Sequence, residues 1–264
     1  MPPLNIIVTV KQVPDTAEVR IDPKTNSLMR EGIPSILNPE DANAVEAALR
    51  LKDEHGGTVT AITMGPPQAE AVLEEVMCFG VDRAVLLSDR AFAGSDTLLT
   101  AFTLSRAILK LKKFDIILCG RQAIDGDTAQ VGPQIAAFLD IPQVTYGEEI
   151  IFFEGAFRIQ RGLESTREQV EARPPVLVTV NAAGPVPRYG SLYALEGACS
   201  GESLKRWSAK DLALSPAMLG LGASPTAVKK IFEPDRSVKG EVLQGSEKEM
   251  AAQLIARLRD MSCL

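Results

Sequence analysis

Four short apolar runs, separated by stretches of helical periodicity, constrain the fold of this chain more than any other feature of its sequence. Strands that are buried on both faces of a parallel sheet appear as continuous apolar runs, and each parallel pair needs a crossover connection, usually a helix. The alternation therefore predicts an α/β fold with a doubly wound, mostly parallel sheet. The runs are Ile6 to Val10, Val59 to Thr63, Ala84 to Leu87 and Ile116 to Cys119.

Helix signals lie between these runs. Asn38 suits the cap of a first helix and Pro39 its first turn, and the acids Glu40 and Asp41 place negative charge at the positive end of the helix dipole. We expect the helices to flank the sheet. They should span about 39–54, 68–79 and 96–112, and a further helix should end near residue 139.

The alternation weakens after the fourth run. The stretch 149–161, which turns at Glu154 and Gly155, predicts a β-hairpin, and Val176 to Val180 predicts a late buried strand, so the sheet should be mixed. From about Gly184 the chain is rich in proline, glycine and serine and has little periodicity until a last helix at about 246–259. A tail of this composition predicts an extended C-terminal arm.

The composition argues against several classes of protein. With 264 residues, of which 45% are hydrophobic, the chain can bury a substantial core. A net charge of -6 argues against nucleic acid as a partner, because proteins that bind nucleic acid concentrate positive charge. The first apolar run is too short for a secretion signal or a membrane span, and the four cysteines form no C-x-x-C pair. We therefore expect a cytoplasmic protein without membrane insertion, a disulfide framework or a zinc site.

The sequence lacks the residues that protein-based catalysis needs. His55 is the only histidine, and it precedes two glycines that predict the end of a helix. No combination of residues resembles an activated nucleophile, a paired-carboxylate site or a metal cage. The two commonest nucleotide motifs, the P-loop and a glycine-rich turn after the first strand, are absent as well. We expect no catalytic residue and no metal site, so that a bound redox cofactor would have to carry the chemistry.

The polar turn after the fourth run is the most informative segment. It leads into a helix whose start is marked by Pro133, and the free amides of a helix start form an anion site. For a bound nucleotide, Asp125 and Asp127 would accept hydrogen bonds from ribose hydroxyls or brace the loop, and Thr128 and Gln130 would face phosphate. An acidic, well-capped turn without a ligand explains the same residues.

Other strand ends and helix starts border the same expected crevice, because open α/β sheets bind ligands at the carboxyl ends of their strands. Thr9 and Lys11 end the first strand, Asn38 opens the first helix, and Met64 ends the second strand. Each also has a structural explanation, as core, as a solvated charge or as a helix cap. The run 94–97 before the third helix is either an N-cap or a polar wall that faces a cofactor.

Several segments resemble the electron-transfer flavoprotein beta family, in the same order and with the same spacing. The strongest is the polar turn from Gly120 to Ala136. The likeness extends to about residue 192 and is weak beyond it. The other segments are Val10 to Thr16, Leu37 to Pro39, Met64 to Pro66, Gly80 to Ala84, Leu139 to Gln143, Pro174 to Val180 and Pro187 to Tyr189.

The resemblance implies one half of a heterodimer. In this family an alpha subunit holds an electron-carrying FAD, and the beta subunit binds a second adenine nucleotide, either FAD or AMP. The implied organisation is an α/β nucleotide-binding domain of the adenine nucleotide alpha-hydrolase type at 1–190, then a partner-recognition loop and C-terminal arm with a terminal helix at 191–264. We take FAD as the expected cofactor and AMP as the alternative. The implied pocket residues are Thr9, Lys11, Asn38, Met64, Asp125, Asp127, Thr128, Gln130, Val131, Gly132, Pro133, Gln134 and Ala136, to which we add Asp96 and Thr97 for a flavin.

The resemblance also implies redox partners. The partner-recognition loop of the family starts at Leu192, but the lysine-rich run that normally follows is replaced by Glu196 to Ser200. An acyl-CoA dehydrogenase-like partner and another redox partner are therefore both open. Residues 11–16 and 94–97 are similar to the electron-bifurcating branch, which splits electron pairs from NADH at a second FAD. Residues 162–166 resemble the ordinary, non-bifurcating branch, so the subtype stays open.

Two other functions fit an open α/β chain of this kind. A redox-inert sensor that resembles universal stress proteins would share the core and bind ATP or AMP, but the glycine-rich phosphate loop that those proteins usually carry late in the chain is missing here. An NAD-dependent dehydrogenase would need the glycine motif and a proton-transfer residue. We therefore expect an electron-transfer subunit that relays electrons between dehydrogenases and an acceptor.

Overall fold

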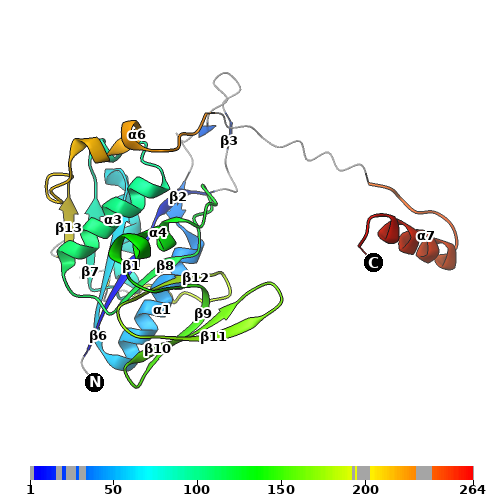
Figure 1. Ribbon diagram of the computed structural model, residues 1–264, viewed down its shortest axis with the longest axis horizontal. Coiled ribbons are helices and arrows are strands. Elements are labelled where there is room, and N and C mark those ends of the chain that lie inside the picture. Colours follow the sequence, from blue (N-terminus) through cyan, green and yellow to red (C-terminus); the bar gives the residue numbers. More distant parts are fainter. Residues whose placement is uncertain are drawn as a thin grey trace. The chain divides into compact units, whose positions relative to one another are not determined.

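A nine-stranded sheet forms the centre of the larger unit of this computed structural model (Figure 1). The structure describes residues 3–15, 20–21, 28–29, 34–191, 194, 203–229 and 240–263. The chain divides into two compact units, Met1–Lys229, which contains the sheet, and Lys230–Leu264.

The sheet is mostly parallel. The seven strands β9, β12, β8, β1, β6, β7 and β13 are neighbours in this order, and each neighbouring pair is parallel. β10 pairs antiparallel with β9, and β11 pairs antiparallel with β10. This arrangement confirms the predicted doubly wound α/β fold with a hairpin. From edge to edge the strands are β11 (Arg167–Ala172), β10 (Ala156–Gly162), β9 (Gln143–Phe153), β12 (Val176–Val180), β8 (Ile116–Gly120), β1 (Leu4–Thr9), β6 (Gly57–Met64), β7 (Arg83–Leu87) and β13 (Leu204–Trp207).

Helices cover both faces of the sheet. α1 (Pro39–His55) and α2 (Glu70–Phe79) pack on one face, and α3 (Thr97–Leu111) and α4 (Val131–Leu139) pack on the other. Successive side chains of β1 alternate between the two layers, since Ile6 and Val8 belong to the core beneath α1 and Ile7 belongs to the core beneath α3. A strand buried on both faces therefore has the continuous apolar sequence from which it was predicted.

Short elements complete the larger unit. β2 and β5 form an antiparallel pair directly after β1 and before α1, so they lie next to the strand ends that the candidate site uses. The bounds of the short elements are β2 (Gln12–Pro14), β3 (Arg20–Ile21), β4 (Leu28–Met29), β5 (Ser35–Leu37), η2 (Pro67–Ala69), η3 (Arg90–Phe92), η4 (Pro216–Met218) and α6 (Gly220–Ala223).

Two strands of the sheet are not predicted by the periodicity. β11 is charged and exposed along most of its length, and it pairs with β10 through ion pairs such as Arg158 with Glu171 (3.1 Å). β13 lies in the stretch after Gly184 for which we expected an aperiodic arm, and it adds to the edge of the sheet beside β7. Both are edge strands in which polar residues interrupt the apolar ones, so they lack the apolar run that marks a central strand.

The smaller unit contains one helix among its described residues, α7 (Glu247–Asp260), which agrees with the helix expected at 246–259. Ser246 accepts a hydrogen bond from the Glu249 amide, and the Glu249 carboxylate accepts in turn from the Ser246 amide, so a capping box starts the helix. The boundary between the two compact units lies after residue 229. The resemblance implies a functional boundary at 190, which stays a prediction.

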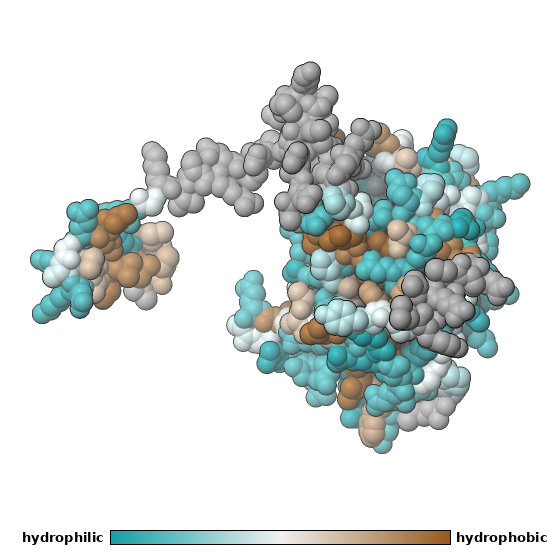
Figure 2. All heavy atoms as spheres, turned by 180° about the vertical axis from the view of Figure 1, so that it is seen from behind, coloured by the Kyte–Doolittle hydropathy of each residue, from teal (hydrophilic) through white to brown (hydrophobic). Residues whose placement is uncertain are grey.

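The face of the larger unit drawn in Figure 2 is mainly hydrophilic. On the face drawn in Figure 2, polar residues cover most of the larger unit, with small apolar areas between them. Among the described residues, no helix combines the length and the apolar character that a bilayer crossing requires.

Candidate functional site

The candidate site lies where β1 and β8 separate. These strands pair as far as Thr9 and Cys119, after which Val10 donates to the Ile62 carbonyl in β6 (2.9 Å) and the chain after β8 turns toward β12. The order of the strands reverses at this point, because the chain runs from β1 through β6 to β7 on one side and places β8 and β12 on the other. A crevice at such a reversal is where open α/β sheets bind ligands.

Asn38 fastens the polar turn to the start of α1. Its side chain is completely buried, its Nδ2 donates to the Gln122 carbonyl (2.9 Å), and its Oδ1 accepts from the Ile124 amide (3.1 Å). Asn38 occupies the N-cap position of α1 as predicted, but its side chain makes no capping hydrogen bond with the helix. The hydrogen-bonding groups of the Asn38 side chain bind the polar turn instead. Pro39 lies in the first turn of α1, as predicted.

The two acids that follow also bind the polar turn. Glu40 pairs with Arg121 (3.1 Å) and accepts from the Gln122 amide (3.0 Å). The carboxylate of Asp41 accepts from the backbone amide of Lys11 through Oδ2 (2.8 Å) and from that of Gly120 through Oδ1 (3.0 Å). Both carboxylates are buried. Their role extends beyond the helix dipole to which the sequence assigned them, because they connect α1 with both strand ends of the crevice.

Burial has a clear electrostatic effect on Asp41. Removal of the carboxyl from water raises its pKa from the ordinary value of 3.8 to about 7, although hydrogen bonds from Asn38, Lys11 and Gly120 oppose the shift. Burial also raises the pKa of the neighbouring Cys119 thiol, with a further contribution from the charge of Asp41. The floor of the crevice is therefore a poorly solvated region.

Lys11 and Asp125 meet above this floor. The Lys11 Nζ lies 2.7 Å from Oδ1 and 2.8 Å from Oδ2 of Asp125, although the two residues are 114 positions apart in the sequence. Both side chains keep contact with solvent. Beyond them Asp127 has a left-handed backbone (φ 50°) and is exposed together with Thr128. The strand-end argument thus placed Lys11 and Asp125 correctly beside each other, and their contact with a nucleotide stays a prediction.

The start of α4 packs closely on the sheet. A side chain at Gly132 would lie 2.7 Å from the Cys119 Sγ and 2.9 Å from a methyl of Thr179, so only glycine fits there. Ala136 is completely buried in the core. These two residues are therefore part of the packing between α4 and the sheet, and a contact with a nucleotide stays a prediction. The Gln134 Oε1 is buried and has no hydrogen-bond partner among the described residues. The predicted residues of this helix are Val131, Gly132, Pro133, Gln134 and Ala136.

Thr97 links the start of α3 to the start of α4. Its hydroxyl donates to the Gln130 Oε1 (3.2 Å), so two helix starts that carry free amides lie next to the polar turn. The Asp96 carboxylate is used by the chain itself, since it caps α3 through the Leu99 amide (3.1 Å) and accepts from the amide and hydroxyl of Thr226 (3.1 and 2.9 Å). A cofactor contact of Asp96 stays a prediction.

Two further predicted residues, Thr9 and Met64, lie at the carboxyl ends of their strands. Thr9 is buried at the end of β1, opposite Cys119 in the register. Met64 ends β6 and packs half-buried against the core on the α3 face. Leu192 lies outside the described residues. The described residues contain no cluster of His, Cys, Asp and Glu that could hold a metal ion.

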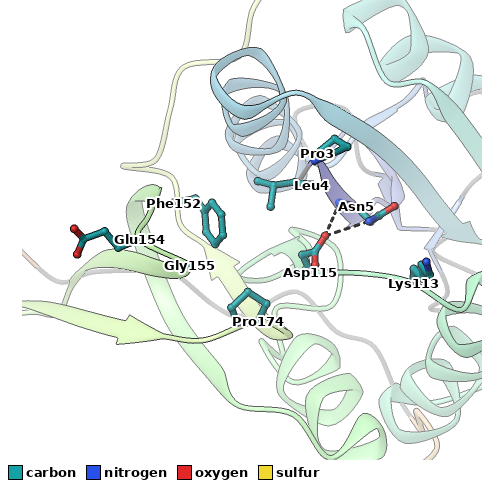
Figure 3. Close-up of a pocket in the computed structure, with 9 residues that line it drawn as sticks. All are labelled: Pro3, Leu4, Asn5, Lys113, Asp115, Phe152, Glu154, Gly155 and Pro174. Atoms are coloured by element: carbon teal, nitrogen blue, oxygen red, sulfur yellow. Dashed lines mark hydrogen bonds between the residues drawn. The ribbon is translucent and has the colours of Figure 1, made fainter. Parts of the chain in front are cut away.

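A hollow of about 580 Å³ lies at the opposite edge of the sheet (Figure 3). It is lined by apolar side chains, among them Leu4 and Phe152, and by Asp115, whose carboxylate accepts from the backbone and side-chain amides of Asn5 (2.7 and 3.2 Å). It lies at the amino ends of β1 and β8 and shares no residue with the crevice. It is therefore separate from the candidate site.

Comparison with known proteins identifies the family. A family model described as the electron transfer flavoprotein domain matches residues 25–209. The electron transfer flavoprotein subunit beta of Clostridium acetobutylicum is 51% identical over 97% of this chain and 98% of its own length. Subunit CarD of the caffeyl-CoA reductase-Etf complex of Acetobacterium woodii is 48% identical over 97% and 98%. Protein FixA of Azorhizobium caulinodans is 44% identical over 97% and 94%.

These similarities extend over nearly the whole chain and confirm the resemblance that the strand-end segments indicated. The nine-stranded, doubly wound sheet agrees with the fold expected for such a subunit. The chain therefore belongs to the beta subunits of the electron transfer flavoproteins, and its function is electron transfer.

Proposed function

We propose that this chain binds FAD in the crevice between β1 and β8 and, joined to an alpha subunit with its own FAD, bifurcates electrons from NADH in the cytoplasm. The observation that carries the proposal is the hydrogen bond between Thr97 and Gln130, because it brings a second helix start to the polar turn. One helix start suffices for the phosphate of AMP, whereas FAD has a flavin beyond its pyrophosphate. The relative CarD, at 48% identity, belongs to a caffeyl-CoA reductase-Etf complex.

The residues at the crevice suit an adenine nucleotide. Backbone amides at the start of α4 can donate to phosphate oxygens, with Thr128 and Gln130 beside them. Lys11 neutralises Asp125 through their ion pair, so this carboxylate repels a phosphate less than its charge alone suggests. The ribose hydroxyls would donate to Asp127. The buried, unpartnered Gln134 Oε1 provides an acceptor for a donor group of the ligand.

The start of α3 suits the flavin part of the ligand. The amino-terminal amides of this 15-residue helix favour negative charge, and Thr97 holds them next to the turn. Bound FAD would supply the redox chemistry, while the chain binds it, orients it and shields it from water. Electron transfer then depends on how these elements position the flavin.

AMP is the alternative ligand, and one observation favours it. Thr226 and Leu99 engage the Asp96 carboxylate, which leaves fewer polar groups at the start of α3 for a flavin. With AMP, this subunit would be a non-bifurcating electron carrier whose nucleotide has a structural role. Acyl-CoA dehydrogenase-like enzymes and other redox proteins are the proposed partners in either case.

The alpha subunit is the partner that we propose for the smaller unit. Among the described residues, α7 buries none of its side chains, and its Leu254 and Ile255 are half exposed. An amphipathic helix of this kind normally covers its apolar side chains against another surface. We propose that the alpha subunit provides this surface.

The nucleotide content of the native heterodimer tests the cofactor. We expect two FAD per heterodimer when both subunits are produced together, purified without stripping, denatured and separated by chromatography. One FAD and one AMP would establish the alternative. A heterodimer in which only the alpha subunit carries a nucleotide would contradict a nucleotide site in this chain altogether.

A bulky residue at position 97 should expel the FAD of this subunit alone. The Thr97→Phe variant loses the bond to Gln130 and places a ring between the starts of α3 and α4, so we expect about one FAD per heterodimer and no NADH-driven reaction. Leu98→Phe is the matched control, because Leu98 is the exposed next residue of the same helix. Two bound FAD in the Thr97→Phe protein would remove Thr97 from the site.

A further inference from the structure

Asp41 occupies the gap that opens between β1 and β8. Past their last pair, Val10 donates to β6 through the Ile62 carbonyl (2.9 Å), and Arg121 donates to β12 through the Val180 carbonyl (2.8 Å). The amides of Lys11 and Gly120 are left facing the gap. One carboxylate meets both of them, at 2.8 Å and 3.0 Å, with a different oxygen for each strand end.

The surrounding backbone is shaped around this carboxylate. A Cβ added to Gly120 would lie 2.4 Å from the Asp41 Oδ1, so the chain approaches the carboxylate more closely than any other residue would allow. Asp41 is 6% exposed and has no lysine or arginine head group as an ion-pair partner among the described residues. The Lys11 head group forms its ion pair with Asp125, although its charge also lowers the pKa of Asp41.

A buried carboxylate that accepts from two backbone amides and from Asn38, but has no ion-pair partner among the described residues, is a costly way to hold two strands together. Burial disfavours its charged form, and this effect outweighs the hydrogen bonds that favour it. Hydrogen bonds of the sheet itself hold parallel strands without such a cost, as they do along the rest of β1 and β8. Stability alone therefore gives no reason for an ionisable group at this position, whereas the geometry of the crevice does.

We propose that Asp41 is a positioning residue of the nucleotide site, which sets the distance between Lys11 and the polar turn by holding both strand ends on one carboxylate. Lys11 follows one of the two amides directly, and its Nζ carries Asp125. Gly120 precedes Arg121 and the rest of the turn that leads to α4. The proposal rests on the nucleotide-binding function proposed above.

Asp41→Asn tests the role with the smallest change in shape. Asparagine offers one acceptor oxygen and one NH₂ donor, so it can accept from only one of the two amides and turns a donor toward the other. Asparagine also cannot ionise, so it avoids the cost of a buried charge at pH values where Asp41 is ionised. We expect the native heterodimer with this variant to fold and to release the nucleotide of this chain about tenfold faster, and we expect faster hydrogen exchange only at the amides of Lys11 and Gly120.

Asp115→Asn is the matched control. Asp115 also accepts from a backbone amide of β1, that of Asn5 (2.7 Å), but at the opposite edge of the sheet (Figure 3). We expect this variant to keep the nucleotide with the release rate of the unchanged protein. Release measured by dilution into excess unlabelled nucleotide compares the three proteins directly.

The outcomes separate the two proposals. Faster release from Asp41→Asn, with exchange confined to the two strand ends, supports the positioning role. Unchanged release overturns it, and so does exchange that rises throughout β1 and α1, because a general loss of stability then explains the result. If the unchanged protein holds no nucleotide in this chain, the proposed function itself fails.

Discussion

Replacing Gly120 with alanine should empty the nucleotide site and lower the midpoint of thermal unfolding by about 6 to 12 °C. The added Cβ would lie 2.4 Å from the Asp41 Oδ1, 2.8 Å from the Asp41 amide nitrogen and 2.8 Å from the Glu40 carbonyl carbon. Two of these atoms belong to the backbone of α1 and cannot rotate away. Forcing a methyl group into such a packed place costs about 3 kcal/mol, the upper end of the usual range.

The effect on the nucleotide follows from the same contact. Relief of the overlap requires α1 to move away from β8, and the start of α1 holds both Lys11 and the polar turn. Gly126→Ala is the control. Gly126 lies in the same turn, and a Cβ added there would have no other atom within 4 Å. Nucleotide content after gel filtration and thermal unfolding of both heterodimers decide the matter. A Gly120→Ala protein that keeps its nucleotide would contradict the tight contact.

The stability of the protein should fall as pH rises from 5 to 8, and Asp41 should account for about 2 to 3 kcal/mol of the fall. The folded chain keeps the proton of this carboxyl up to about pH 7, whereas the unfolded chain loses it near 3.8. Between these values the folded state binds the extra proton, so the free energy of unfolding decreases with pH. The contribution is complete below 3.8 and is lost as pH rises through 7.

Other groups near Asp41 do not reproduce this window. Arg121 stays charged throughout it, because Glu40 raises the pKa of its guanidinium, and burial keeps the Cys119 thiol protonated. Acids with lowered pKa values, such as Glu46 and Asp96, are ionised above pH 5 in both the folded and the unfolded chain. Burial also raises the pKa of Glu75 on α2, so the slope for the unchanged protein contains a contribution from that group as well as from Asp41.

Comparison with Asp41→Asn isolates the contribution of the carboxyl. We expect the unfolding midpoint of the variant to depend less on pH. The difference between the midpoints of the variant and the unchanged protein should therefore shift in favour of the variant between pH 5.5 and 8. An infrared titration should show a neutral carboxyl signal that disappears near pH 7 and is missing from the variant. Parallel pH dependence of the two proteins would show that the proton resides elsewhere.

The elements of the sheet were predictable because each central strand is buried on both faces. β1 and β8 have the continuous apolar sequences that such burial requires, and α1 and α3 between strands have helical periodicity. β13 was not predictable from periodicity, because Leu204 to Trp207 contains two basic residues and lies at an edge. Its place depends on pairing with β7, a contact between segments more than a hundred residues apart.

The candidate site was predictable in outline and not in its inner contacts. The strand-end rule brought Lys11 and Asp125 to one edge, since the carboxyl ends of parallel strands gather there. It gave no reason to expect that Asn38 and Asp41 would bind residues about 80 positions away. Acids in the first turn of a helix are common for the sake of the dipole alone, so a single sequence does not distinguish these.

The polar turn has a fixed inner side and a self-contained outer side, and this asymmetry bears on how the family can diversify. Residues 120–124 are bound to α1, whereas the amides of Gly126 and Asp127 return to the Ala123 carbonyl within the turn. Substitutions at 126 and 128 can therefore accumulate without disturbing the framework, whereas the left-handed backbone at Asp127 favours aspartate, asparagine or glycine. The residues that face a ligand at the outer side of the turn can therefore change between related proteins while residues 120–124 keep their contacts with α1. A designer can use the same separation to alter ligand preference.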